Sequence, residues 1–243
     1  MIRGGFLVEH LETLPRGWTA RVRVPPDAPL FDGHFPGRPV VPGIALLLLI
    51  GDLAGEQAAQ ETVPVRLRGV RFRAPAGPAS ALAVRFQDGR FAVTEDDAIV
   101  VDGEMALSPP SVDLPLADTT KALPPPFLPH APPALLVTGA SAGHAVARIP
   151  ARSPLARGGR VPSCVVLEAA AQGAQGRGRS GPPRSGLLVR VSEASFPAGH
   201  LALETPFLVR VEEDGAAPPL HRFRARAELG GASAAIAFAV LVS

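Results

Sequence analysis

Two stretches of the chain carry the same order of hydrophobic and polar positions. Each begins with strand-like alternation, over Trp18–Val24 in the first and His144–Ile149 in the second, and continues through a loop rich in proline and glycine. Each loop leads into a segment that is apolar on nearly all sides, Ile44–Ala59 and Val165–Gly176. Because both segments follow a proline and lack a polar face, they are predicted to be buried helices.

Alternating, strand-like runs follow each predicted helix, and turn residues separate most of them. The predicted strands are Val65–Phe72, Ala81–Phe86, Arg90–Thr94 and Ala98–Ala106 in the first stretch, and Gly186–Val191, Phe207–Glu212, His221–Leu229 and Ala234–Val242 in the second. A central helix with an antiparallel sheet, present twice, predicts an α+β fold with an internal repeat of about 120 residues.

A proline-rich stretch, residues 108–126, separates the two repeats. It holds six prolines and shows no hydrophobic periodicity, which is typical of a semi-rigid linker. The sequence therefore predicts one domain over residues 1–107, a linker over 108–126 and a second domain over 127–243.

Composition narrows the function classes. A net charge of +2 is small for a protein that binds a phosphate backbone, and the absence of tyrosine disfavours stacking on nucleic-acid bases. A single cysteine excludes an internal disulfide framework and a cysteine-based zinc cluster. With no secretion signal and no apolar run long enough to cross a bilayer, we expect a cytoplasmic protein without a membrane span. The basic surplus of the second half could suit an acidic partner or form an ordinary solvated surface.

The most specific string is DGHFPGRPVVPG, residues 32–43. Its glycines permit tight backbone geometry, and its prolines stiffen the loop around His34. Gly43 lies at the start of a predicted helix, where free N–H groups can polarise a carbonyl. A histidine beside such a site is a natural general base, although a lone loop histidine is more often only a surface residue.

This string resembles the active-site signature of hotdog-fold 3-hydroxyacyl-[acyl carrier protein] dehydratases, GHFPGxPxxPGVxxxEAxAQ. Residues 127–137, FLPHAPPALLV, are similar to the opening LLPHRYPFLLVD of such dehydratases. Residues 159–172, GRVPSCVVLEAAAQ, are similar to a segment of the dehydratase-like partner subunits of aryl polyene systems. The resemblance implies two tandem hotdog domains, each an antiparallel sheet wrapped around a central helix, which form an intramolecular double hotdog.

Each half departs from the family pattern at one position. Leu48 stands where the first half should carry its acid, and Asp52, one helical turn further on, is an alternative acid. In the second half Glu168 and Gln172 match the family's helix residues, but Pro154 stands at the histidine position. Each half therefore holds one member of the catalytic pair.

In the family, each active site takes its histidine from one hotdog and its acid from the other. The resemblance therefore implies that His34 and Glu168 are the catalytic pair of one complete site, whereas Leu48 and Pro154 mark an inert one. Glu168 could instead form an ion pair with an arginine between the domains, and we interpret His130 as a structural residue. The expected substrate-binding residues are Phe35, Pro42, Gly43 and Gln172, with no metal.

The implied reaction is dehydration of 3-hydroxyacyl thioesters on an acyl carrier protein to trans-2-enoyl thioesters, in polyketide, polyene or fatty acid biosynthesis. No cofactor is expected beyond the phosphopantetheine that carries the substrate. The expected partners are the acyl carrier protein and a ketosynthase or ketoreductase of the pathway. One alternative is a non-catalytic pseudo-dehydratase that binds acyl carrier protein or a partner dehydratase. Another is a hotdog thioesterase, which the GHFPG loop disfavours.

Overall fold

The computed structural model describes residues 1–35, 37–114, 123–125, 128–141, 143–175 and 186–242. The two α-helices are α1, Gly43–Gln57, and α2, Val166–Gln175. The strands of the first half are β1 Ile2–Arg3, β2 Phe6–Leu14, β3 Gly17–Arg23, β4 Val63–Phe72, β5 Ala81–Gln87, β6 Arg90–Glu95 and β7 Ala98–Ser108. Those of the second half are β9 Val137–Ser141, β10 His144–Arg148, β12 Gly186–Ser195, β14 Pro206–Ala217, β15 Leu220–Leu229 and β16 Ala232–Val242.

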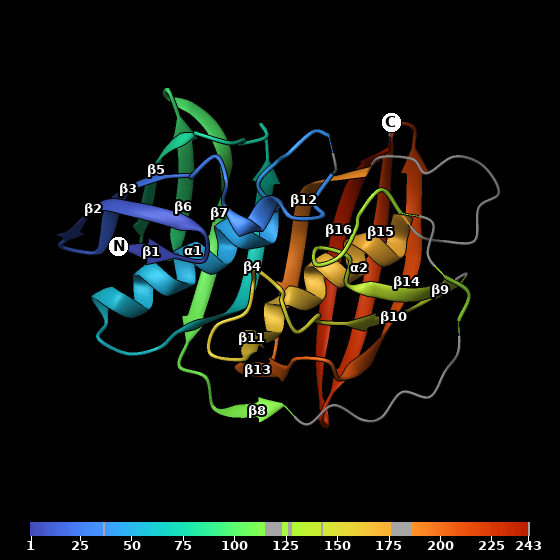
Figure 1. The fold of residues 1–243 in the computed structure, drawn as a ribbon. Helices are drawn as coiled ribbons and strands as arrows, with labels where there is room; N and C mark the ends of the chain where they lie inside the picture. Colours follow the sequence, from blue (N-terminus) through green and yellow to red (C-terminus); the bar gives the residue numbers. More distant parts are fainter. Residues whose placement is uncertain (36, 115–122, 126–127, 142, 176–185, 243) are drawn as a thin grey trace.

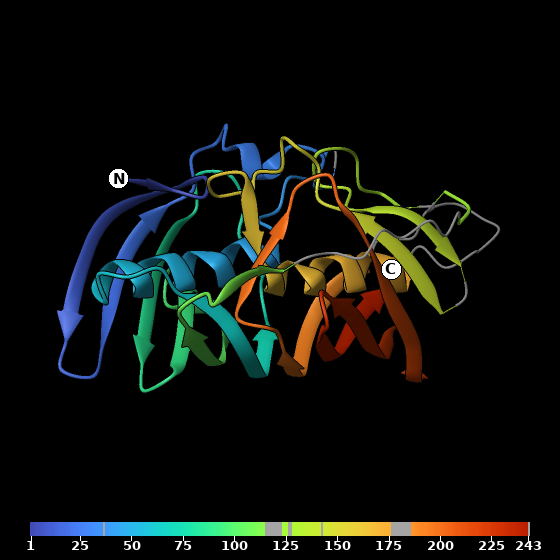
Figure 2. The same ribbon diagram turned by 90° about the horizontal axis from the view of Figure 1, so that it is seen from below.

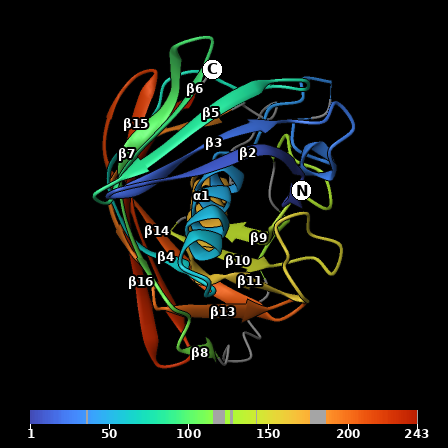
Figure 3. The same ribbon diagram turned by 90° about the vertical axis from the view of Figure 1, so that its left-hand side faces the viewer.

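These strands form one continuous sheet of 13 strands, in the order β1-β2-β3-β5-β6-β7-β4-β12-β16-β15-β14-β10-β9 (Figure 1). The first half of the sheet curls around α1, as the end-on view shows (Figure 3). Both helices lie on the same face of the sheet, and their N-terminal ends are directed toward its middle (Figure 1 and Figure 2). Each half is thus an antiparallel sheet wrapped around one helix, which confirms the predicted double hotdog.

The two halves join edge to edge through β4 and β12, which pair antiparallel. Val70 lies opposite Val191, and Leu67 lies opposite Ala194, with all four side chains buried. Because the hydrogen-bond ladder continues across the junction, the halves share one core.

The predicted helices and strands are confirmed, with boundaries that differ by a few residues. The structure adds a second sheet of three strands, β11 Arg160–Pro162, β13 Gly199–Ala202 and β8 Val112–Leu114. β8 lies within the stretch predicted to be a linker and pairs parallel with β13. Its proline-rich surroundings gave no strand signal, because such a short strand depends on the edge it joins. Residues 115–122 and 126 of that stretch, and Gly176, lie outside the described residues.

Within the described residues, neither helix combines the length and hydropathy that crossing a membrane requires.

Candidate active site

A cavity of about 210 Å³ lies at the N-terminal ends of the two helices. The first half contributes His34, Phe35 and Gly43 to its wall, and the second half contributes His130 and Glu168. Most of the remaining lining is apolar, with residues of α1, β4 and β12. The cavity therefore brings the glycine- and proline-rich loop of one half against the helix of the other.

The loop that carries His34 is held against the second half by its backbone. The N–H of Ala131 donates to the carbonyl oxygen of Gly33 at 2.9 Å. Gly33 has a φ of +73°, and a Cβ there would lie 1.9 Å from the carbonyl oxygen of Ala131. Only glycine fits this approach, which explains why it directly precedes His34.

The imidazole of His34 has a defined tautomer. Its Nδ1 lies 2.8 Å from the carbonyl oxygen of Val40, which can only accept, so Nδ1 carries the proton and donates it. Nε2 is then unprotonated and can accept a proton. Burial lowers the pKa of His34, against the opposing effects of the nearby Glu168 carboxylate and the Val40 carbonyl. The ring is therefore neutral near pH 7, as a general base requires.

The ring of Phe35 packs against both histidine rings, whose own centroids are 5.4 Å apart. Its ring centroid lies 4.6 Å from that of His34 and 4.9 Å from that of His130. Its φ of +53° is in the left-handed region, which a bulky residue adopts at a cost of about 1–3 kcal/mol. Such strain between two histidines indicates that this position is constrained by the site.

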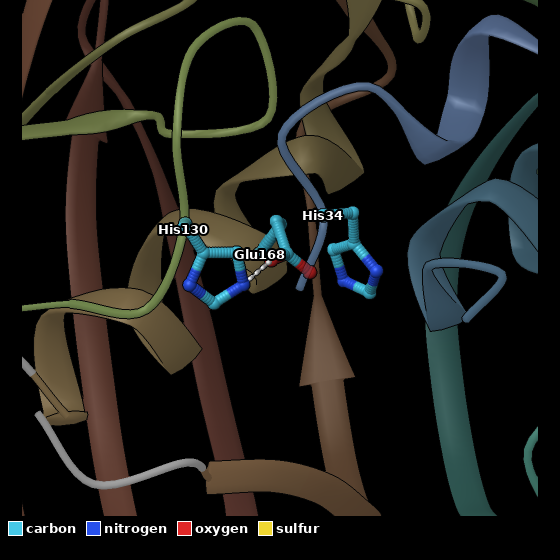
Figure 4. Close-up of side chains that lie close together, drawn as sticks. All are labelled: His34, His130 and Glu168. Atoms are coloured by element: carbon cyan, nitrogen blue, oxygen red, sulfur yellow. Dashed lines mark ion pairs between the residues drawn. The ribbon is translucent and has the colours of Figure 1, made fainter. Parts of the chain in front are cut away.

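Glu168 points from the first turn of α2 into the cavity between the two histidines (Figure 4). One ligand atom from each of His34, His130 and Glu168 lies within 4.8 Å of the others. His34 and Glu168, predicted from different halves, are thus brought together. Such a group could hold a divalent metal ion, although the ligand atoms of a tetrahedral site are usually only about 3.4 Å apart.

Gln172 lies one turn after Glu168 and is fully buried. Its Oε1 accepts from the N–H groups of Leu136 and Val137, at 2.9 and 3.3 Å. Its Nε2 donates to the carbonyl oxygen of Ala134 at 2.9 Å and to Oε1 of Glu168 at 3.0 Å. Protein groups thus occupy all four hydrogen-bonding positions of the amide. Gln172 thus anchors residues 134–137 and contacts Glu168, and its role as a substrate contact stays a prediction.

The other predicted binding residues lie around the pair. Gly43 lines the cavity at the first residue of α1, where a Cβ would lie 2.6 Å from the ring of Phe72. Pro42, the N-cap, lines a smaller adjoining space together with His34 and Glu168.

His130, which the sequence suggests to be a structural residue, also lines the cavity. Only 7% of the residue is exposed, and its Nε2 lies 3.9 Å from Oε1 of Glu168. Burial lowers its pKa, which the carboxylate of Glu168 raises and His34 lowers further. The sequence feature that could have indicated a role in the site is the string FLPHAPP, which is similar to the opening of the dehydratases. This string lies far from Glu168 along the chain.

The reciprocal position is closed by an ion pair. Nε of Arg157 donates to Oδ2 of Asp52 at 3.1 Å, and Nη1 donates to the carbonyl oxygens of Pro154 and Ala156. Burial raises the pKa of Asp52, and Arg157 opposes this effect. Leu48 is 2% exposed and belongs to the core. Asp52 therefore forms an ion pair with Arg157 and does not line the cavity that contains His34.

Comparisons with known sequences point to dehydratases. A family model described as ApeI dehydratase matches residues 12–104. The 3-hydroxyacyl-[acyl-carrier-protein] dehydratase FabZ of Syntrophotalea carbinolica is 31% identical over 92 residues, which cover 34% of this chain and 63% of that protein. FabZ of Acidovorax sp. is 36% identical over 89 residues, 32% of this chain and 61% of that protein. The chain thus spans about three fifths of these two relatives.

Two solved structures share the whole fold at low sequence identity. The dehydratase domain of RzxB from Pseudomonas fluorescens has a TM-score of 0.67 at 12% identity, over 96% of this chain and 97% of that chain. The dehydratase domain of a mycocerosic acid synthase-like polyketide synthase has a TM-score of 0.59 at 14% identity, over 99% and 97%. At such identities the likeness concerns the fold alone.

A longer match decides the family. FabZ of Albidiferax ferrireducens is 31% identical over 119 residues, which cover 42% of this chain and 78% of that protein. Together with the family model, this match shows that the chain belongs to the FabZ family of 3-hydroxyacyl-[acyl-carrier-protein] dehydratases.

Proposed function

We propose that this protein removes water from 3-hydroxyacyl thioesters on an acyl carrier protein and forms trans-2-enoyl thioesters, in polyketide, polyene or fatty acid biosynthesis. One observation carries the proposal: His34 from the first half and Glu168 from the second meet in one cavity. Membership of the FabZ family supports the reaction class.

The reaction begins at C2 of the substrate. Nε2 of His34 takes the C2 proton, while Nδ1–H keeps its bond to Val40 and holds the ring in place. The thioester carbonyl gains enolate character as the proton leaves. The N–H of Gly43, at the positive end of the α1 dipole, is placed to stabilise the oxygen.

Loss of the hydroxyl completes the elimination. Glu168 gives its proton to the C3 hydroxyl, the C3–O bond breaks, and the group leaves as water while the C2–C3 double bond forms. The proton on His34 then passes to Glu168, so that both groups return to their starting states. The phosphopantetheine of the carrier protein is part of the substrate, and the proposed elimination requires no other cofactor.

The test is turnover of a 3-hydroxyacyl thioester on acyl carrier protein, followed by the absorbance of the enoyl product. His34→Ala and Glu168→Gln should each lower kcat at least about 100-fold. Asp52→Asn is the matched control, because it alters the acid of the other helix that lies one turn beyond the position corresponding to Glu168. Activity that survives Glu168→Gln and disappears in Asp52→Asn would refute the composite site.

A second candidate function is a pseudo-dehydratase subunit that binds acyl carrier protein or a partner dehydratase. The Arg157–Asp52 pair at the reciprocal position supports this function, because the second catalytic pair of the family is replaced there. Acyl carrier protein that binds without turnover, in the presence and absence of a partner dehydratase, would favour this function.

A further inference from the structure

His130 lies across Glu168 from His34 and takes no part in the reaction outlined above (Figure 4). We propose that His130 is a positioning residue that donates its Nε2–H to Oε1 of Glu168. The second half of the chain then supplies both the acid, Glu168, and the residue that orients its carboxyl group. This inference rests on the proposed function and deepens it.

The surroundings of His130 favour one tautomer. Its Nδ1 is buried and has no hydrogen-bond partner among the described residues. A proton on Nδ1 would bury an unpaired N–H group, which is unfavourable. The neutral ring therefore carries its proton on Nε2, the nitrogen that faces Glu168.

The ring is held in position from both halves of the molecule. The ring of Phe35, from the first half, packs against it at 4.9 Å, and Gln172 anchors the segment that follows it through Ala134. The side chains of His130 and Glu168 are only 2% and 12% exposed, so water screens the pair little. The 3.9 Å separation is longer than a hydrogen bond and would tighten when substrate fills the site.

The contact with His130 would determine which carboxyl oxygen of Glu168 carries the proton that is transferred to the C3 hydroxyl of the substrate. Oε1 already accepts a hydrogen bond from Nε2 of Gln172 at 3.0 Å. A second donor on Oε1 turns Oε2 toward the hydroxyl that it must protonate. Once that proton has left, the two donors face the carboxylate and hold it in the same orientation. The titratable groups that face His130 are Glu168, on α2, and His34, in the loop before α1.

The test compares two substitutions of His130. His130→Phe keeps a ring of similar shape but removes the donor, and should lower kcat about 10- to 100-fold with KM nearly unchanged. His130→Gln restores an N–H donor near the original Nε2 and should recover most of the rate. His144→Phe, in β10 of the same half, is the matched control and should leave the rate unaltered.

The split between KM and kcat separates positioning from a structural role. A positioning residue changes kcat with KM nearly unaltered, and the conservative variant His130→Gln restores the rate. Equal loss of rate in His130→Phe and His130→Gln would overturn the proposal.

A measurement without turnover distinguishes this proposal from the proposed function. Nitrogen-15 NMR of histidine-labelled protein should show His130 as the Nε2–H tautomer, with a resonance that shifts in Glu168→Gln. An Nδ1–H tautomer would refute the positioning role even in an active enzyme. An inactive protein with the Nε2–H tautomer and the Glu168-dependent shift would instead refute the dehydration.

Discussion

Gln172→Met tests how far one buried amide holds the second half of the site together. Methionine has nearly the same length and volume, so the change removes hydrogen bonds without opening a large cavity. It deprives two buried N–H groups, of Leu136 and Val137, and one carbonyl, of Ala134, of their partner. It also removes a donor from Glu168.

The expected magnitude follows from the groups left unpaired. The two buried N–H groups, at about 1–2 kcal/mol each, lower the free energy of unfolding by about 2–4 kcal/mol, and the half-buried carbonyl of Ala134 adds less. For a chain of this size, that change lowers Tm by at least about 4 °C. Dehydration should fall as well, because residues 134–137 follow His130 and Glu168 loses the donor that orients it.

The assay is urea denaturation of both proteins, with thermal unfolding as a second measure. Gln175→Met is the matched control in the same helix, because Oε1 of Gln175 is buried without a partner among the described residues. Among the described residues, removing Gln175 leaves no carbonyl or N–H group without a partner, so its effect should stay within about 1 kcal/mol. Equal stability losses in the two variants, or a loss below about 1 kcal/mol for Gln172→Met, would refute this reasoning.

Three further predictions concern single groups. Asp52→Asn should leave dehydration within about twofold of the unaltered protein but lower the free energy of unfolding by about 1–2 kcal/mol, because Arg157 loses its ionic partner. Because burial lowers the pKa of His34 below 6.5, kcat/KM should begin to fall only when the pH drops below that value and the base gains a proton. A loss of kcat/KM that already begins above pH 6.5 as the pH is lowered would contradict this assignment. Burial raises the pKa of the Cys164 thiol, so a disulfide reagent should modify it only after denaturation, and rapid modification of the folded protein would be evidence against its burial.

The proposed catalytic pair and the residues around it differ in how far the sequence could predict their positions. His34 and Glu168 lie in strings with specific spacing, so their types and separate halves could be found from the sequence. The contacts of Gln172 could not be found in this way, because its amide forms hydrogen bonds with residues 134–137, more than thirty positions earlier in the chain. His130 likewise acquires its neighbours only through folding, since nothing local in FLPHAPP indicates a buried contact with α2.

The inert position illustrates the same limit. The spacing identified Leu48 and Pro154 as departures and left Asp52 open as an acid. The structure decides the matter through Arg157, which reaches Asp52 from a loop 105 positions away. An ion pair over such a separation leaves no periodic trace in the chain.

The sequence by itself determined the repeat, the two buried helices and most of the long strands of the sheet, although the strand Phe6–Leu14 was not among those predicted. These follow from hydrophobic periodicity and turn residues, which act over a few neighbouring positions. Only the tertiary structure decided which side chains share a cavity, which tautomers they adopt and which carboxylate is already engaged. Those outcomes depend on burial and on single hydrogen bonds between segments far apart in the chain, and they arise when β4 and β12 join the two halves into one sheet.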